Sequence, residues 1–289
     1  LDNFSNISQK SIQHYGAQVL PVASAYVLSE EYADVNALRA ENDATNFTVP
    51  LLGLFNFSKA GYLVFNVIVF LCFLLLFGLE GVRGRLKAIK VFKKSCVVLL
   101  TAVAVLALGE LIGYVCAEIA GARFKPFGIV QGVQFDNAAM IASIALMAVL
   151  SAIVYVIFRN RAVRAVSGSM RASAAVSAAT QHAYNSLYGT LALMFVLSAA
   201  LVFTLGENLM FVVPLLCATA AMILYHMTSL RLWLVLSIAL ILLHAFSFLY
   251  ALAMALTIGA LGAVMMLAFC DLMVLIPLAD LYMMPSRKK

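Results

Sequence analysis

The stretch Tyr62–Leu79, YLVFNVIVFLCFLLLFGL, decides the fold because it is apolar almost throughout and carries no charge. A segment of roughly 20 such residues crosses the hydrocarbon layer of a bilayer as an α-helix. Six further apolar runs of similar length follow it along the chain. They are Cys96–Ala117, Ala138–Phe158, Leu187–Leu205, Leu209–Met227, Leu232–Leu256 and Ala260–Met284. The sequence therefore predicts an all-α, polytopic integral membrane bundle of about seven transmembrane helices.

The composition excludes an ordinary soluble domain. Hydrophobic residues make up 64% of the chain, charged residues 11%, and the mean hydropathy is +1.02. Soluble domains carry about a quarter of their residues as charges. The five cysteines lie in or beside the apolar runs without CxxC spacing, so neither a disulfide framework nor a thiolate zinc site is expected. The net charge of +6 does not indicate nucleic acid binding, because the cations are sorted by membrane side.

The distribution of Lys and Arg predicts the orientation of the bundle. Most of the 19 basic residues lie between the first and second, third and fourth, or fifth and sixth apolar runs, or after the seventh. The positive-inside rule assigns those loops to the cytoplasm. An odd number of spans then puts the N-terminus and residues 1–60 outside the cytoplasm, and the tail 285–289 inside it.

The first cytoplasmic loop holds the densest cluster of cations, and two interpretations of it remain open. Its members are Arg83, Arg85, Lys87, Lys90, Lys93 and Lys94. The cluster is a topology signal, with no partner, or it also recognises lipid headgroups. Basic residues beside a membrane attract anionic lipids at about 1 kcal/mol per charge. The lipid bilayer, with anionic lipids at its cytoplasmic face, is the expected environment.

Ahead of the apolar runs, Asp2–Val27 reads DNFSNISQKSIQHYGAQVLPVASAYV. Ser8 is a suitable N-cap for an amphipathic helix that begins there. The segment resembles the end of the peptidase domain in the M28 zinc metallopeptidases, which are aminopeptidase-like enzymes. In membrane-bound members of that family, the last helix leads into a short strand and several transmembrane helices, and Val49–Phe55 resembles the strand. The residues that carry the pattern are Ile7, Ser8, Ser11, Ile12, Gln13 and Gly16.

The resemblance implies a division of the chain and a role for it. Residues 1–34 would end the peptidase domain, 35–60 would form an extracytoplasmic linker with a strand, and 61–284 would form the transmembrane domain. Zinc and its His, Asp and Glu ligands would belong to the upstream peptidase domain, ahead of Leu1. This chain is then expected to hold no catalytic residue, metal ligand or cofactor, and His14 is interpreted as a surface histidine. The expected role is to anchor the peptidase and to gate or orient peptide substrates; oligomerisation and lipid sensing are further roles that seven helices suggest.

Three ionisable residues inside the apolar runs form a predicted intramembrane polar cluster: Glu110, His244 and Asp271. Each costs at least about 2.5–3.5 kcal/mol at the centre of a membrane helix, so each needs a partner or a function. Counting residues along the runs predicts similar depths for all three, and a pair between His244 and Asp271. Gly109 and Gly113 flank Glu110 in GxxxG spacing, which predicts close helix packing. The cluster is interpreted as a packing clasp, a proton or cation relay, or a metal site, and the alternative function is a transporter or channel.

Overall fold

A computed structural model describes residues 9–29, 44–49, 53–130, 137–167 and 172–284. The chain divides into two units, Leu1–Thr45 and Asn46–Lys289. In the first unit, helix α1 spans Gln9–Leu28, where the sequence predicts a helix. Ile7 and Ser8, which belong to the family pattern, lie outside the described residues, as does the predicted tail 285–289.

Two short strands precede the first membrane helix. Strand β1, Ala44–Val49, pairs with β2, Gly53–Ser58, in a two-stranded sheet. The strand predicted at Val49–Phe55 is thus divided between the end of one strand and the start of the next. Gly53 has φ of 101°, a backbone conformation that glycine adopts readily because it has no Cβ. The Ser58 hydroxyl then accepts a hydrogen bond from the Gly61 amide at 3.2 Å and caps the following helix.

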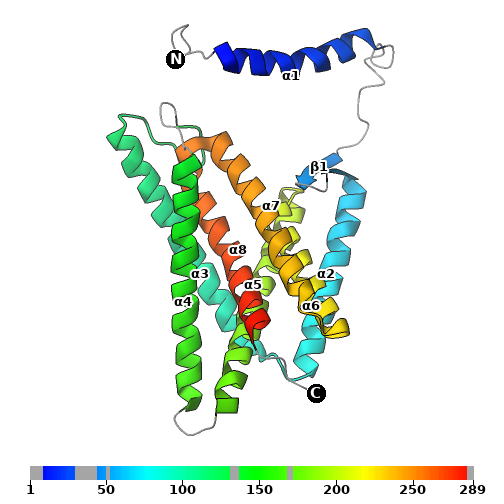
Figure 1. Cartoon of the computed structure of the whole chain (residues 1–289), viewed down its shortest axis with the longest axis vertical. Coiled ribbons are helices and arrows are strands. Elements are labelled where there is room, and N and C mark those ends of the chain that lie inside the picture. Colours follow the sequence, from blue (N-terminus) through cyan, green and yellow to red (C-terminus); the bar gives the residue numbers. More distant parts are fainter. Residues whose placement is uncertain (1–8, 30–43, 50–52, 131–136, 168–171, 285–289) are drawn as a thin grey trace. The chain divides into compact units, whose positions relative to one another are not determined.

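Within the described residues, seven helices long and apolar enough to cross a membrane follow, which confirms the predicted all-α membrane bundle (Figure 1). The η2 turn, Thr257–Ala260, separates the last two of them where the sequence predicts a break. The first turns of α3 extend beyond its predicted apolar run, so that Lys90, Lys93 and Lys94 lie on the helix and not in a loop. The helices are α2 Lys59–Val82, α3 Ala88–Ile119, α4 Asn137–Ser167, α5 Ala172–Thr204, α6 Leu209–Thr228, α7 Leu232–Leu256 and α8 Leu261–Met283.

Contacts between loops and helix ends gather the basic segments at one end of the bundle. Arg85, after α2, lies 3.3 Å from the His226 ring near the end of α6. Arg159, near the end of α4, donates a hydrogen bond to Asp280 of α8 at 3.0 Å. We call the end of the bundle that holds these basic segments the basic end. The end that carries the α5–α6 loop and η2 is called the opposite end. Which end faces the cytoplasm stays a prediction.

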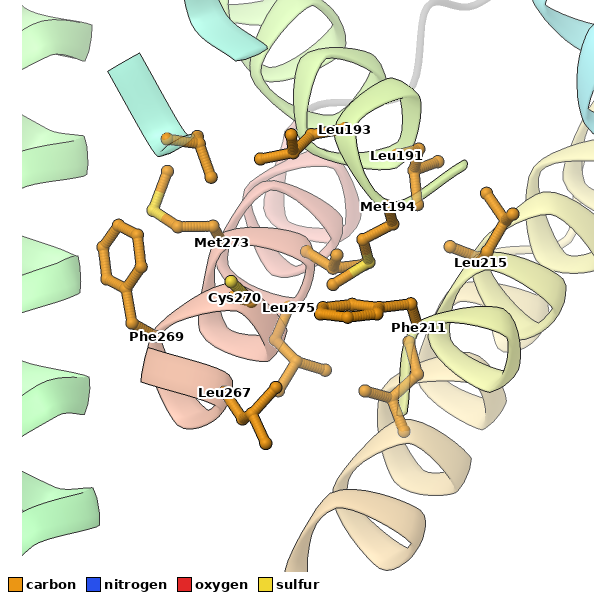
Figure 2. Packing of buried hydrophobic residues seen from close by; sticks show 14 of the residues in the cluster. Leu191, Leu193, Met194, Phe211, Leu215, Leu267, Phe269, Cys270, Met273 and Leu275 are labelled. Atoms are coloured by element: carbon orange, nitrogen blue, oxygen red, sulfur yellow. The ribbon is translucent and has the colours of Figure 1, made fainter. Parts of the chain in front are cut away.

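Helix α8 forms the centre of the bundle. It packs against α3, α4, α5, α6 and α7. Of the residues in the apolar stretch of α8, 78% are buried, compared with 17% in the apolar stretch of α4. Figure 2 shows Met194 of α5, Phe211 of α6 and Leu275 of α8 meeting in this core, while Phe269 points to the other side of α8. The outer helices instead expose large apolar side chains, such as Leu75, which is 67% exposed. In a bilayer such side chains contact lipid tails.

Helices α3 and α8 cross closely. A Cβ placed on Gly109 would lie 2.5 Å from the Cα of Gly262, and one on Gly113 would lie 3.1 Å from the Ile258 carbonyl oxygen. The two glycines of the GxxxG pattern therefore lie on the face of α3 that meets η2 and the start of α8. Small residues at such crossings allow backbones to approach and pack in membranes.

Candidate functional site

Glu110 lies where α3 meets the first turn of α8. Its Oε1 is 2.5 Å from the position that a Cβ on Gly262 would occupy. Both carboxylate oxygens are shielded from the surface, and no described residue donates a well-formed hydrogen bond to them. The backbone of Gly262 nevertheless lies against the Glu110 side chain. First-turn amides have no partner within their helix and form the positive end of its dipole, so the amino end of α8 is the electrostatic partner of Glu110.

The three intramembrane ionisable residues do not share one depth, which corrects the prediction for Glu110. Asp271 lies nine residues beyond Gly262 on α8, a rise of about 14 Å. His244 lies in the middle of α7 and is close to the depth of Asp271. Glu110 lies nearer the opposite end because α3 is 32 residues long and begins at Ala88, well before the predicted run.

His244 and Asp271 are both buried, and each residue is only 7% exposed. The His244 ring stacks on Phe248 with centroids 6.2 Å apart, and its Nε2 has no hydrogen-bond partner in the described part of the chain. Helices α7 and α8 form the predicted hairpin. Among the described residues, however, no hydrogen bond or ion pair joins any two of Glu110, His244 and Asp271. The same part of the chain contains no group of three or more His, Cys, Asp or Glu side chains that could hold a metal ion.

At the basic end, basic side chains surround a buried carboxylate. Glu80, near the end of α2, is fully buried, and its oxygens lie 2.9 Å from Arg83 Nη1 and 3.2 Å from Arg85 Nη1. His226 of α6 places Nε2 3.2 Å from Glu80 Oε1, without the geometry of a hydrogen bond. Burial alone would lower the pKa of the Arg85 guanidinium, but Tyr184 and Glu80 outweigh it and raise that pKa. These groups, which we call the Glu80 cluster, tie α2 and the α2–α3 loop to α6.

A second carboxylate at the basic end joins α4 to α8. Asp280 Oδ2 accepts hydrogen bonds from the Tyr155 hydroxyl at 2.7 Å and from Arg159 Nε at 3.0 Å. The Tyr155 ring meets the His182 ring of α5 edge-on, with centroids 5.1 Å apart. Charge-assisted hydrogen bonds of this kind are among the stronger ones in proteins. These hydrogen bonds hold α4 against α8, and the ring contact adds α5 to the same group.

The opposite end is held by a neutral network around Asn208. Its Oδ1 accepts a hydrogen bond from the Tyr62 hydroxyl at 2.5 Å, and its Nδ2 donates to Asn66 Oδ1 at 2.7 Å. The same amide nitrogen lies 2.5 Å from the Ser198 hydroxyl. All four residues are buried, and they link α2, α5 and the start of α6. We call them the Asn208 network.

Sequence reasoning missed the Glu80 cluster and the Asn208 network, although a signal for each was present. Asn66 is a lone amide within an apolar run, and such a residue needs a partner in hydrocarbon. Glu80 precedes Arg83 by three residues, a spacing that brings opposite charges together on a helix. The predicted polar cluster contains only ionisable residues from the middle of the runs, and neither amides nor helix ends belong to it.

The six cations of the first basic loop divide into two groups. Arg83 and Arg85 are bound by Glu80. The other four instead line a cavity beside α3: Lys87, Lys90, Lys93 and Lys94.

No protein-family model, curated protein or solved structure matches the chain. The class of protein therefore follows from the fold itself: the seven apolar helices define a multi-pass helical membrane protein whose environment is a lipid bilayer.

Proposed function

We propose that this chain is the transmembrane domain of an M28-type zinc metallopeptidase, which anchors an extracytoplasmic peptidase domain at the membrane. The observation that carries the proposal is the resemblance of the segment around Ile7–Gly16 to the end of that peptidase fold. The order of elements after it agrees with the resemblance: a helix, short strands and then the membrane bundle.

The surface of α1 adds support. Val19, Val22 and Val27 are 60%, 70% and 77% exposed, so these apolar side chains of the helix lack cover among the described residues of the first unit. The helix also contains Pro21, which removes an internal hydrogen bond and costs about 3 kcal/mol. Helices in proteins gain most of their stability from the packing of an apolar face against the rest of the fold. A peptidase domain packed on α1 would supply the missing stabilisation.

The proposal implies a division of roles between the two parts of the protein. Zinc chemistry would belong to the upstream domain, and this chain would hold that domain at the membrane and orient peptides toward it. On this proposal, purified full-length protein hydrolyses aminoacyl substrates, and a zinc chelator abolishes the activity. Residues 59–289 alone remain inactive with or without added zinc.

The coding sequence upstream of Leu1 tests the proposal most cheaply. A peptidase domain that ends in a His-containing zinc-ligand turn supports it. An upstream sequence without such a domain, or full-length protein whose hydrolysis is unaffected by chelation, contradicts it.

A transporter or channel is the second candidate function, favoured by the unbonded carboxylate of Glu110 in the bundle interior. Buried ionisable groups in membranes often mark ion pathways. Liposomes containing the bundle would then pass protons or cations faster than empty liposomes, and Glu110→Gln would abolish the difference. Equal flux with and without the protein eliminates this function.

A further inference from the structure

Two neighbouring helices leave a gap at the basic end. Helices α3 and α4 both pack against α5 and α8, but they make no extensive contact with each other. A cavity of about 720 Å³ lies between them, with α5 as its floor. Ligand sites commonly have volumes of roughly 300–1,000 Å³. The described lining residues are Lys87, Lys90, Lys93, Lys94, Val97, Phe158, Ala162, Ser177, Ala178, Gln181, His182 and Asn185.

A close approach of α5 to α3 fixes the floor of this cavity. A Cβ on Gly189 would lie 2.6 Å from the Cβ of Lys94, and the Ser95 hydroxyl donates to the Gly189 carbonyl oxygen at 2.7 Å. One and two turns before Gly189, α5 presents Asn185 and His182 to the cavity. The glycine therefore holds polar groups of α5 beside the lysines of α3.

The charge in the cavity is uncompensated. Its described lining contains four lysines and no carboxylate, and none of the four forms an ion pair with a described residue. The nearby arginines behave differently, because Arg85 and Arg159 each bind an acidic side chain. Four like charges around one cavity repel one another, and an anion with several oxygens would relieve that repulsion.

The lining changes from basic to apolar along the helices. Lys87 caps α3 at the basic end, and Val97 lies ten residues further into the bundle, about 15 Å away. Helix α4 runs the opposite way, so its Ala162 faces the mouth and its Phe158 the deeper part. Lys94 marks the transition, with Nζ 4.9 Å from the centre of the Phe158 ring. Basic groups at the mouth and apolar groups further in match the order of phosphate and acyl chains in a phospholipid.

We propose that this cavity binds one anionic phospholipid, with its phosphate among the four lysines and its acyl chains along Val97 and Phe158. Gln181, His182 and Asn185 supply polar groups for the remainder of the headgroup. The phosphate chemistry alone would also suit a soluble phosphate ester, but the position of the cavity between two apolar helices and its apolar inner part favour the lipid.

Native mass spectrometry of the full chain in detergent tests this site. Dioleoyl phosphatidic acid, dioleoyl phosphatidylcholine and glycerol 3-phosphate are added separately and in competition. The phosphatidic acid is expected to bind at least about tenfold more tightly than the phosphatidylcholine, because several lysines act on its extra charge. Equal binding of the two lipids overturns the proposal.

Matched variants locate the binding. Lys90→Gln is expected to weaken phosphatidic acid binding about fivefold, and K87Q/K90Q/K93Q more than about a hundredfold. Arg164→Gln removes the same charge from an exposed position of α4 that does not line the cavity, and it should change binding less than about twofold. Equal losses in Lys90→Gln and Arg164→Gln would show only general attraction to the basic end and overturn a defined site. Displacement of the lipid by equimolar glycerol 3-phosphate would assign the cavity to a soluble anion and overturn the lipid.

Discussion

The two ends of the bundle are held together by different chemistry. At the opposite end, the Asn208 network joins three helices through neutral amides and hydroxyls that are all buried. At the basic end, the Glu80 cluster joins helices through a carboxylate and cations that are partly exposed, with 47% of the Arg83 side chain accessible. The first arrangement depends on the fit of hydrogen bonds, and the second depends also on water and salt.

The two ends are expected to differ in how much they stabilise the fold and in how strongly they respond to salt and lipid. A buried neutral network costs much to disrupt, because each partner left unpaired loses its hydrogen bond without regaining water. Partly exposed ion pairs contribute less and are screened by salt. The opposite end is therefore expected to act as a fixed fastening, and the basic end as the part that senses ions and lipids.

Asn208→Leu is expected to have the largest effect. It leaves Tyr62, Asn66 and Ser198 without their shared partner, and we expect a loss of about 3 kcal/mol in unfolding free energy. Unfolding can be followed with a thiol-reactive dye, because Cys270 is buried in the folded protein. Ser198→Ala removes one member only and should cost about 1 kcal/mol. An unchanged melting temperature in Asn208→Leu would contradict the fastening role.

Gly109→Ala should have the second-largest effect and lower the free energy of unfolding by about 2 kcal/mol, because the new methyl group would meet the backbone of Gly262. Gly78→Ala is the matched control, since a Cβ there meets nothing within 4 Å. Alanine favours the helix over glycine, so the control should be neutral or stabilising by up to about 1 kcal/mol. Equal behaviour of the two variants would count against a close α3–α8 crossing.

Glu80→Gln should lower the free energy of unfolding by about 2 kcal/mol. This loss is smaller than that expected from breaking a fully buried ion pair, because Arg83 and Arg85 can reach water. The wild-type protein should lose part of its stability as salt rises from about 0.01 M to 1 M, where the Debye length falls to about 3 Å. The variant should lose less. Denaturant melts at the two salt concentrations measure this difference, and identical salt dependence would remove the distinction between the two ends.

Asp271→Asn should have the smallest effect, under about 1 kcal/mol, because no described residue pairs with this carboxylate. A His244–Asp271 clasp would make the same change costly. Thermal melts of Asp271→Asn and His244→Ala in the same detergent therefore test whether the middle of the bundle contains a polar fastening. A decrease of more than about 3 kcal/mol in the unfolding free energy of Asp271→Asn would support a His244–Asp271 clasp.

Much of the fold could be predicted from the sequence. Apolar length alone identifies a membrane helix, so the seven spans and the break at Thr257 follow from the order of the residues. Helix ends were less predictable, because Lys90 and Lys94 continue α3 outside hydrocarbon, where polarity no longer distinguishes helix from loop. That error of about two turns misplaced Glu110 in depth.

The sites were predicted less well, and the reason is physical. Which helices are neighbours depends on close crossings such as Gly109–Gly262 and Gly189–Lys94, which periodicity does not reveal. The lysine cavity exists because α3 and α4 each pack on α5 while staying apart. The six cations were visible as a cluster, but their division between Glu80 and the cavity depends on the folded bundle.

Cysteine labelling from outside intact cells tests the central claim, a seven-span bundle whose basic end faces the cytoplasm, most directly. In a variant without the five native cysteines, Glu207→Cys and Arg164→Cys place one thiol at each end. A membrane-impermeant maleimide should label Glu207→Cys in intact cells and Arg164→Cys only after permeabilisation. Labelling of Arg164→Cys in intact cells, with Glu207→Cys protected, would invert the orientation and contradict an extracytoplasmic peptidase domain.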